Sequence, residues 1–144
     1  MSIDLQRLAD QLAVREVSIR YNRHADAEER EQVAALFVED GVLEIADHSI
    51  YKGRDEIATA VFQHIAHITT DPLVELDGDT ARQTSRLLVF NFSPEGAGVD
   101  FITTGHYIDD LVRTPDGWRF TKRRIETDLS FDRLIEVYGS PTWA

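Results

Sequence analysis

The sequence contains no cysteine and no long apolar run. The lack of cysteine excludes disulfides, thiolate metal sites and cysteine nucleophiles together, and it fits a reducing compartment. No apolar segment approaches the roughly 20 residues that a membrane helix needs. The first residues show no basic stretch followed by an apolar core, so no signal peptide is visible. We therefore expect a cytoplasmic protein.

Basic residues are also scarce, because 15 Lys and Arg stand against 26 Asp and Glu and give a formal net charge of −11. So acidic a surface repels phosphate backbones and anionic lipid headgroups, which disfavours nucleic acid and membranes as partners. The remaining composition is globular, with 42% hydrophobic and 28% charged residues. Its length suits one domain over residues 1–144.

The first half of the chain shows helical periodicity. We expect a long, well-covered helix that ends near Asp26, because its apolar residues fall on two lines of helical spacing. A second helix around Val33–Phe37 should end at Asp40–Gly41, and a third should span residues 54–66. The two apolar lines of the first helix are Leu5, Leu8, Leu12 and Ile19, and Val17, Tyr21 and Ala25.

The second half shows the signals of strands and hairpins. The Asp-Gly step at Asp77–Gly78 and the Thr114–Gly117 segment are typical of tight turns between antiparallel strands. The expected strands are residues 42–46, 50–52, 73–76, 81–92, 99–113 and 118–128. Three helices, a small ribbon and a four-strand meander predict an α+β domain. A curved antiparallel sheet wrapped around helices would enclose a conical cavity, which is a natural place for a ligand.

Two polar residues on this apolar scaffold are candidates for chemistry. Asp26 ends the first helix, and His67 lies where the third helix gives way to strands. If the fold brings them together, a carboxylate would orient an imidazole base for proton abstraction. Tyr21 could polarise a carbonyl or protonate a leaving hydroxyl.

Each candidate also has a structural explanation. Asp26 could cap the second helix, with Glu29 reaching back in a capping box. A histidine at a helix end commonly interacts with the helix dipole, and Tyr21 on an apolar helix face is commonly core. His64, His67 and Asp71 could suggest a metal, but no further ligand is convincingly placed, so we expect no metal.

Four strings occur in order along the chain: Ile19–Asp26, Val33–Val42, Tyr51–Ile57, and Gly105–Asp110 continued by Asp116–Phe120. Together they resemble the SnoaL-like branch of the nuclear-transport-factor-2-like superfamily. The resemblance implies its cavity-forming α+β fold and places Asp26 and His67 at the aspartate and histidine that its dehydratases and dehydrochlorinase use. Tyr21 matches a tyrosine that some of the dehydratases carry. The second active-site histidine of scytalone dehydratase has no counterpart here.

The resulting hypothesis is a cofactor-independent lyase or isomerase that acts on a small, largely apolar, possibly cyclic substrate. His106 and Tyr107 must face opposite sides of their strand, as must Arg123 and Arg124. The residues assigned to substrate binding are Phe62, Phe90, Tyr107 and Arg124. Alternatives are a polyketide cyclase or epoxide hydrolase, and a non-catalytic binding or assembly module. Because open sheets of this kind often associate through their exposed face, we expect a homodimer or homotrimer.

Overall fold

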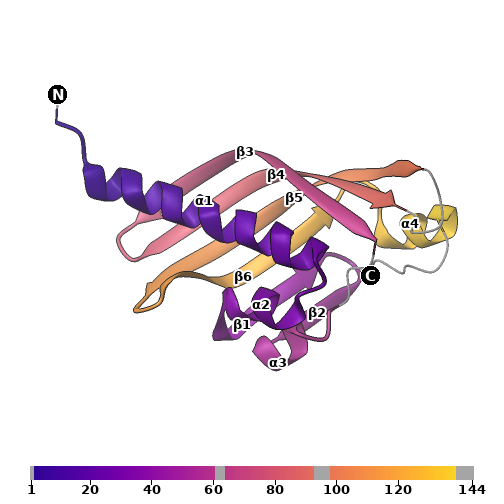
Figure 1. Cartoon of the computed structure of the whole chain (residues 1–144), viewed down its shortest axis with the longest axis horizontal. Helices are drawn as coiled ribbons and strands as arrows, with labels where there is room; N and C mark the ends of the chain where they lie inside the picture. Colours follow the sequence, from indigo (N-terminus) through magenta and orange to yellow (C-terminus); the bar gives the residue numbers. More distant parts are fainter. Residues whose placement is uncertain (1, 61–63, 93–97, 139–144) are drawn as a thin grey trace.

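In the computed structural model, which describes residues 2–60, 64–92 and 98–138, the helices pack against a curved six-stranded sheet (Figure 1). This arrangement confirms the α+β class. The helices are α1 (Leu5–Asp26), α2 (Arg30–Ala35), α3 (Arg54–Ile57) and α4 (Phe131–Tyr138). The strands are β1 (Phe37–Ile45), β2 (Ser49–Lys52), β3 (Ile65–Asp77), β4 (Thr80–Phe92), β5 (Val99–Thr114) and β6 (Gly117–Thr127).

The strands are ordered β2-β1-β6-β5-β4-β3 across the sheet. The meander from β3 to β6 is antiparallel, and Gly78 and Gly117 supply positive φ angles of 57° and 100° at two of its turns. Strand β1 pairs parallel to β6, whereas the sequence predicted an antiparallel sheet. No hairpin joins these two strands, so no tight turn forces them to run in opposite directions.

The second helix is shorter than predicted. Helix α2 ends at Ala35, and the Phe37–Gly41 segment forms the start of β1 instead of the end of a helix. Phe37 pairs in register with Phe120 of β6, and the two ring centroids lie 5.1 Å apart. Pairing with a neighbouring strand therefore outweighs a helical spacing of only a few residues.

The third predicted helix is also too long. Helix α3 covers only Arg54–Ile57, and Ile65 already begins strand β3, of which the sequence predicted only residues 73–76. The extra length is explained by pairing, since Ile65–Thr70 lies in continuous register with Arg86–Asn91 of β4. His67 consequently lies within a strand and not at the end of a helix.

Helix α1 crosses one face of the sheet (Figure 1). The side of α1 that is buried differs from the expected one. The second apolar line is buried, but the first is exposed; Leu12, for example, is 58% exposed. Val14 and three polar residues occupy the rest of the buried side, and the sheet provides partners for the polar ones. A periodicity analysis that ranks only apolar residues as buried does not find these polar positions. The buried polar residues of α1 are Asp10, Ser18 and Asn22.

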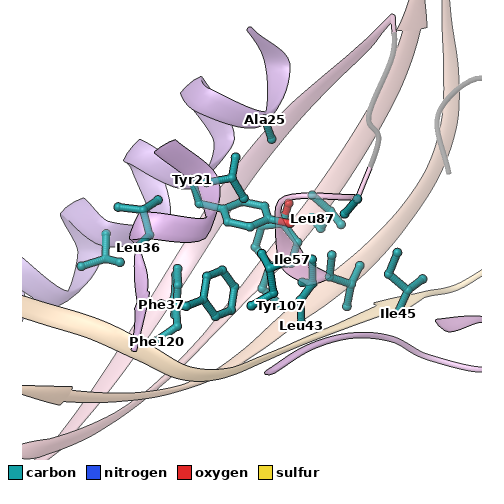
Figure 2. Close-up of a cluster of buried hydrophobic side chains, with 14 of the residues drawn as sticks. Tyr21, Ala25, Leu36, Phe37, Leu43, Ile45, Ile57, Leu87, Tyr107 and Phe120 are labelled. Carbon is teal, nitrogen blue, oxygen red and sulfur yellow. The ribbon is translucent and has the colours of Figure 1, made fainter. Parts of the chain in front are cut away.

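An aromatic cluster fixes the carboxyl-terminal half of α1 on the sheet. Figure 2 shows Tyr21 reaching from α1 into the core beside Phe37, Phe120 and Tyr107. The Tyr21 ring lies 5.9–6.3 Å from these three rings, in edge-to-face geometry. Such contacts hold the end of α1, and with it Asp26, against the sheet. No helix in the described part of the chain has the length and apolar character needed to cross a membrane.

Candidate active site

Asp26 and His67, which are 41 positions apart in the sequence, meet where the end of α1 lies over β3. The ring Nδ1 of His67 lies 2.6 Å from Oδ1 of Asp26. The backbone N–H of His67 also donates to both carboxylate oxygens, at 3.1 and 3.2 Å. The His67 side chain is 5% exposed and that of Asp26 is 30% exposed. One carboxylate thus holds both the backbone and the ring of His67.

This geometry contradicts the capping explanation of Asp26. Asp26 is the last residue of α1, and the N-cap position of α2 is Glu29, which makes no side-chain capping bond. The Glu29 carboxylate instead lies 2.5 Å from Nδ1 of His24. The Asp26 carboxylate is therefore oriented toward β3 and away from α2.

The contact with Asp26 determines which ring nitrogen of His67 could act as a base. A carboxylate accepts hydrogen bonds only, so Nδ1 carries the proton that lies between it and Asp26. A neutral imidazole with its proton on Nδ1 has its lone pair on Nε2. The arrangement fixes both the orientation of the ring and its tautomer.

His67 lines a small cavity between the inner face of the sheet and α4. The cavity has a volume of about 40 Å³, enough for about two or three water molecules. Among the described residues that line it, His67 alone is ionisable, and the hydroxyls of Thr103 and Thr127 donate to backbone carbonyls. The other lining residues are Ile45, Ile65, Leu87, Val89, Ile102, Ile125 and Leu134.

Tyr21 and Tyr107 are both buried beside this site but do not line the cavity. Burial raises the pKa of each phenol well above its ordinary value, so both stay protonated at neutral pH. The Tyr107 hydroxyl donates to Oδ1 of Asn22 at 3.2 Å. Of the pair on β5, Tyr107 is thus the inward residue, but its hydroxyl is occupied by α1.

The two arginines of β6 face opposite sides of the sheet, and the inward one is Arg123. Its guanidinium is completely buried and donates two bonds of 2.8 Å to Asp109 and one of 2.7 Å to Ser18. Burial by itself lowers the pKa of Arg123, but the Asp109 carboxylate outweighs this effect and leaves the pKa raised. The guanidinium carbon also lies 3.8–4.3 Å from the centroids of three aromatic rings, those of Tyr21, Tyr107 and Phe120.

The sequence prediction that Arg124 faces the pocket is corrected by this placement. Arg124 lies on the outer face of β6 and pairs with Glu44 and Glu126. Phe90 also lies on the outer face, where its ring packs edge-to-face against Phe101 at 5.5 Å. Strand neighbours point in opposite directions, and Val89 and Ile125, which flank these two residues, line the cavity. Phe62 lies outside the described residues.

No metal centre forms in the described ranges, where no three His, Asp or Glu side chains converge on one point. The residues that sequence reasoning missed are the buried polar ones that connect α1 to the sheet. A signal for them was present, because Ser18, Asn22 and Asp26 are spaced at i, i+4 and i+8 and so share one face of α1.

Comparisons with known proteins agree with this fold. The family model for the SnoaL-like domain matches residues 6–124. An uncharacterised protein of Mycobacterium tuberculosis is 29% identical, with 87% of this chain and 89% of that protein covered. A nuclear-transport-factor-2-like protein with a cystatin-like fold from Novosphingobium aromaticivorans is 27% identical, with a TM-score of 0.78 and coverage of 91% and 92%.

Two further solved structures share the fold at lower identity. One is a putative scytalone dehydratase from Novosphingobium aromaticivorans, with 24% identity, a TM-score of 0.74 and coverage of 88% of this chain and 89% of that one. The other is a hexachlorocyclohexane dehydrochlorinase, with 20% identity, a TM-score of 0.76 and coverage of 88% and 90%. At these identities the likeness extends to the fold alone.

Proposed function

Because this chain belongs to the SnoaL-like domain family, we propose that it is a cofactor-independent lyase or isomerase of dehydratase type. The substrate is a small, largely apolar molecule, cyclic or open-chain, and His67 is its general base. The observation that carries the proposal is the His67–Asp26 contact of 2.6 Å at the wall of an apolar cavity. Positioned acid–base groups of this kind typically contribute about 10²–10⁴-fold in rate.

The proton steps follow from the position of the lone pair. Nε2 of His67 removes a proton from a carbon next to an activating group, and the electron pair of the broken C–H bond stays with the substrate. Asp26 stabilises the resulting imidazolium through Nδ1. If this electron pair expels a leaving group from the neighbouring carbon, the result is elimination. If the imidazolium instead returns the proton to another carbon of the substrate, the result is isomerisation. Since His67 is the ionisable residue of the described lining, it serves as base and then as acid.

The lining limits what other residues contribute. Tyr21 stays protonated, so its phenol can take part only through a hydrogen bond, which requires the cavity to extend toward it. Arg123 is neutralised by Asp109 and does not line the cavity. A cyclic substrate exceeds a cavity of about 40 Å³, so binding requires lining side chains such as Leu134 to move.

Two fold neighbours support this class of reaction. The names of a putative scytalone dehydratase and a hexachlorocyclohexane dehydrochlorinase both describe eliminations. Elimination from an activated ring begins with removal of a proton, which is the step that the dyad suits. A cyclase or epoxide hydrolase is less well matched, because the described cavity lining contains no carboxylate of its own.

The competing function is non-catalytic binding of a small apolar ligand. The observation that favours it is the size of the cavity, which is small and lined mainly by aliphatic side chains. Such a protein would bind its ligand equally well with or without the His67 imidazole, whereas an enzyme would lose turnover.

The test is a screen of hydroxy-ketones and halogenated rings with the wild type and His67→Ala, Asp26→Asn and His106→Ala. We expect turnover to fall about 10²–10⁴-fold in the first two variants. His106→Ala is the matched control, because His106 lies on the outer face of β5, next to the inward Tyr107. Equal turnover by the wild type and both dyad variants would remove the proposed dyad. Ligand binding that is unaffected by His67→Ala, with no turnover by the wild type, would favour the binding function.

A further inference from the structure

We propose that Asn22 is a positioning residue, which sets the alignment of α1 on β3 and thereby brings the Asp26 carboxylate to Nδ1 of His67. The inference deepens the proposed function and rests on it for its catalytic meaning. Its structural content, the alignment of a helix with a strand, can be tested without a substrate.

The geometry of the two polar links between α1 and β3 carries the inference. Asn22 Nδ2 donates to Oγ1 of Thr69 at 3.1 Å, one helical turn before the contact of Asp26 with His67. Four helical residues rise about 6 Å, and two strand residues rise about 6.7 Å. The rise of the helix from Asn22 to Asp26 thus nearly equals the rise of the strand from Thr69 to His67. Both hydrogen bonds form together when Asn22 lies over Thr69, and a sliding of α1 along β3 breaks them.

A third contact extends the alignment in the same direction. Nη2 of Arg15 lies 3.4 Å from the carbonyl oxygen of Pro72. The partners on β3 therefore run backward from Pro72 to Thr69 to His67 as the helix runs forward. This arginine contact is exposed and long, so the buried Asn22 amide is the stronger constraint.

The Asn22 amide is itself held from the other side. Its Oδ1 accepts the hydroxyl proton of Tyr107 on β5, while its Nδ2 donates to Thr69 on β3. Asn22 is only 8% exposed, and Tyr107 is completely buried. An amide that uses its oxygen and its nitrogen for different strands cannot rotate without losing a bond, and a buried polar group left without its bond is costly.

The position of Asn22 on the helix connects this amide to the dyad. Asn22 and Asp26 lie on the same face of α1, one turn apart, so displacement of one moves the other. Loss of the amide leaves the half-buried Asp26 as the polar link of α1 to this part of β3. The helix can then shift, and the Asp26 carboxylate no longer fixes the tautomer of His67.

The experiment measures the His67 tautomer by imidazole ¹H–¹⁵N NMR at pH 8, with the His67 signals assigned by their loss in His67→Gln. The substitutions are Asn22→Leu, which keeps the side-chain size, and Thr69→Val, which replaces the accepting hydroxyl by a methyl group. We expect both to raise the population of the Nε2–H tautomer relative to Nδ1–H by about five- to tenfold, the equilibrium effect of one lost hydrogen bond.

Two controls separate this role from general loosening. Ser18→Ala removes the bond from α1 to Arg123 one turn earlier and should leave the tautomer ratio unchanged. Thr69→Ser keeps the acceptor and should behave as the wild type. If Asn22→Leu does not fold, Thr69→Val decides the question.

An unchanged ratio in Thr69→Val and in any folded Asn22→Leu, or an equal change in Ser18→Ala, would overturn the role of Asn22. Because no substrate is used, this result stands apart from the fate of the proposed function. Absence of turnover in the wild type would remove the enzyme and leave the alignment result intact.

Discussion

Arg123 is a charged side chain with no exposed surface, and its neighbours explain how the fold tolerates it. Asp109 neutralises it through two bonds of 2.8 Å, and Tyr21, Tyr107 and Phe120 surround the guanidinium. Taking two charges out of water is costly, and a buried pair recovers that cost only with such close geometry. Removing one partner of this ion pair therefore destabilises the fold more than removing both.

We expect Arg123→Met to lower the free energy of unfolding by about 3–5 kcal/mol, because it leaves the Asp109 carboxylate buried without its charge partner. The double variant Arg123→Met/Asp109→Leu should recover most of this loss, since neither charge remains. Urea unfolding of the wild type, both single variants and the double variant measures the effect. Additive losses in the double variant would show that the pair is not coupled.

Asp10 gives a second prediction at the residue scale, for acid stability. Hydrogen bonds from Arg113, at 2.8 Å to each carboxylate oxygen, and from the Trp118 indole lower the pKa of Asp10 below 3.8, its value in an unfolded chain. A lowered folded pKa means that the carboxylate stabilises the fold fully above pH 3.8 and loses this contribution as pH falls toward the folded pKa. The free energy of unfolding should therefore decrease as the pH falls below about 4.

The check is the urea midpoint measured between pH 6 and pH 2. Asp10→Asn should lower the midpoint near neutral pH and flatten its fall in acid, because the asparagine does not titrate. Asp116→Asn, in the exposed turn between β5 and β6, serves as the control and should keep the wild-type slope. A wild-type slope in Asp10→Asn would exclude Asp10 as the source.

At the scale of elements, α4 limits the size of the cavity through Leu134. This side chain is completely buried and lines the cavity, on a helix whose Glu136 and Val137 are exposed. Leu134→Ala should lower the free energy of unfolding by about 2–5 kcal/mol. It should also enlarge the cavity and tighten the binding of a small apolar probe such as benzene. Binding is measured as the rise in thermal unfolding temperature that the probe causes.

Leu12→Ala is the matched control for this leucine, because it removes the same atoms from an exposed site on α1. We expect it to change stability by less than about 0.5 kcal/mol and to leave benzene binding unchanged. If Leu12→Ala and Leu134→Ala lowered the free energy of unfolding by similar amounts, the Leu12 side of α1 would have to be covered in solution.

At the scale of the whole molecule, the outer face of the sheet carries exposed apolar side chains. Ile68 on β3 and Phe101 on β5 are each about half exposed, with the Phe90 ring against Phe101 between them. Apolar side chains gathered on one face commonly mark an interface. We propose that copies of this chain associate through this face as a homodimer or homotrimer.

We expect sedimentation velocity at micromolar concentration to show a dimer or trimer that Phe101→Glu dissociates and Ile19→Glu, on exposed α1, does not. A net charge of −11 on each copy opposes association, and salt screens that repulsion. Association should therefore strengthen with sodium chloride. A wild type that is monomeric under all these conditions would contradict the proposal.

The α+β class, the long first helix and the turns at Gly78 and Gly117 could be predicted without the structure, because they depend on local periodicity and backbone preference. The sequence also singled out Asp26 and His67 as the pair to test. Elements whose identity depends on pairing with distant partners were predicted less well, as Phe37–Gly41 and Ile65–Thr70 show.

Which side chains face inward became known from the packing of the folded chain. Arg123 and Arg124 are equivalent in sequence, and a shift of one residue in strand register exchanges their faces. Likewise, Asn22 is an ordinary polar residue of a helix until Thr69 and Tyr107 lie beside it. Local sequence fixes the period of a helix or strand, but the phase of that period is set by the partner against which it packs.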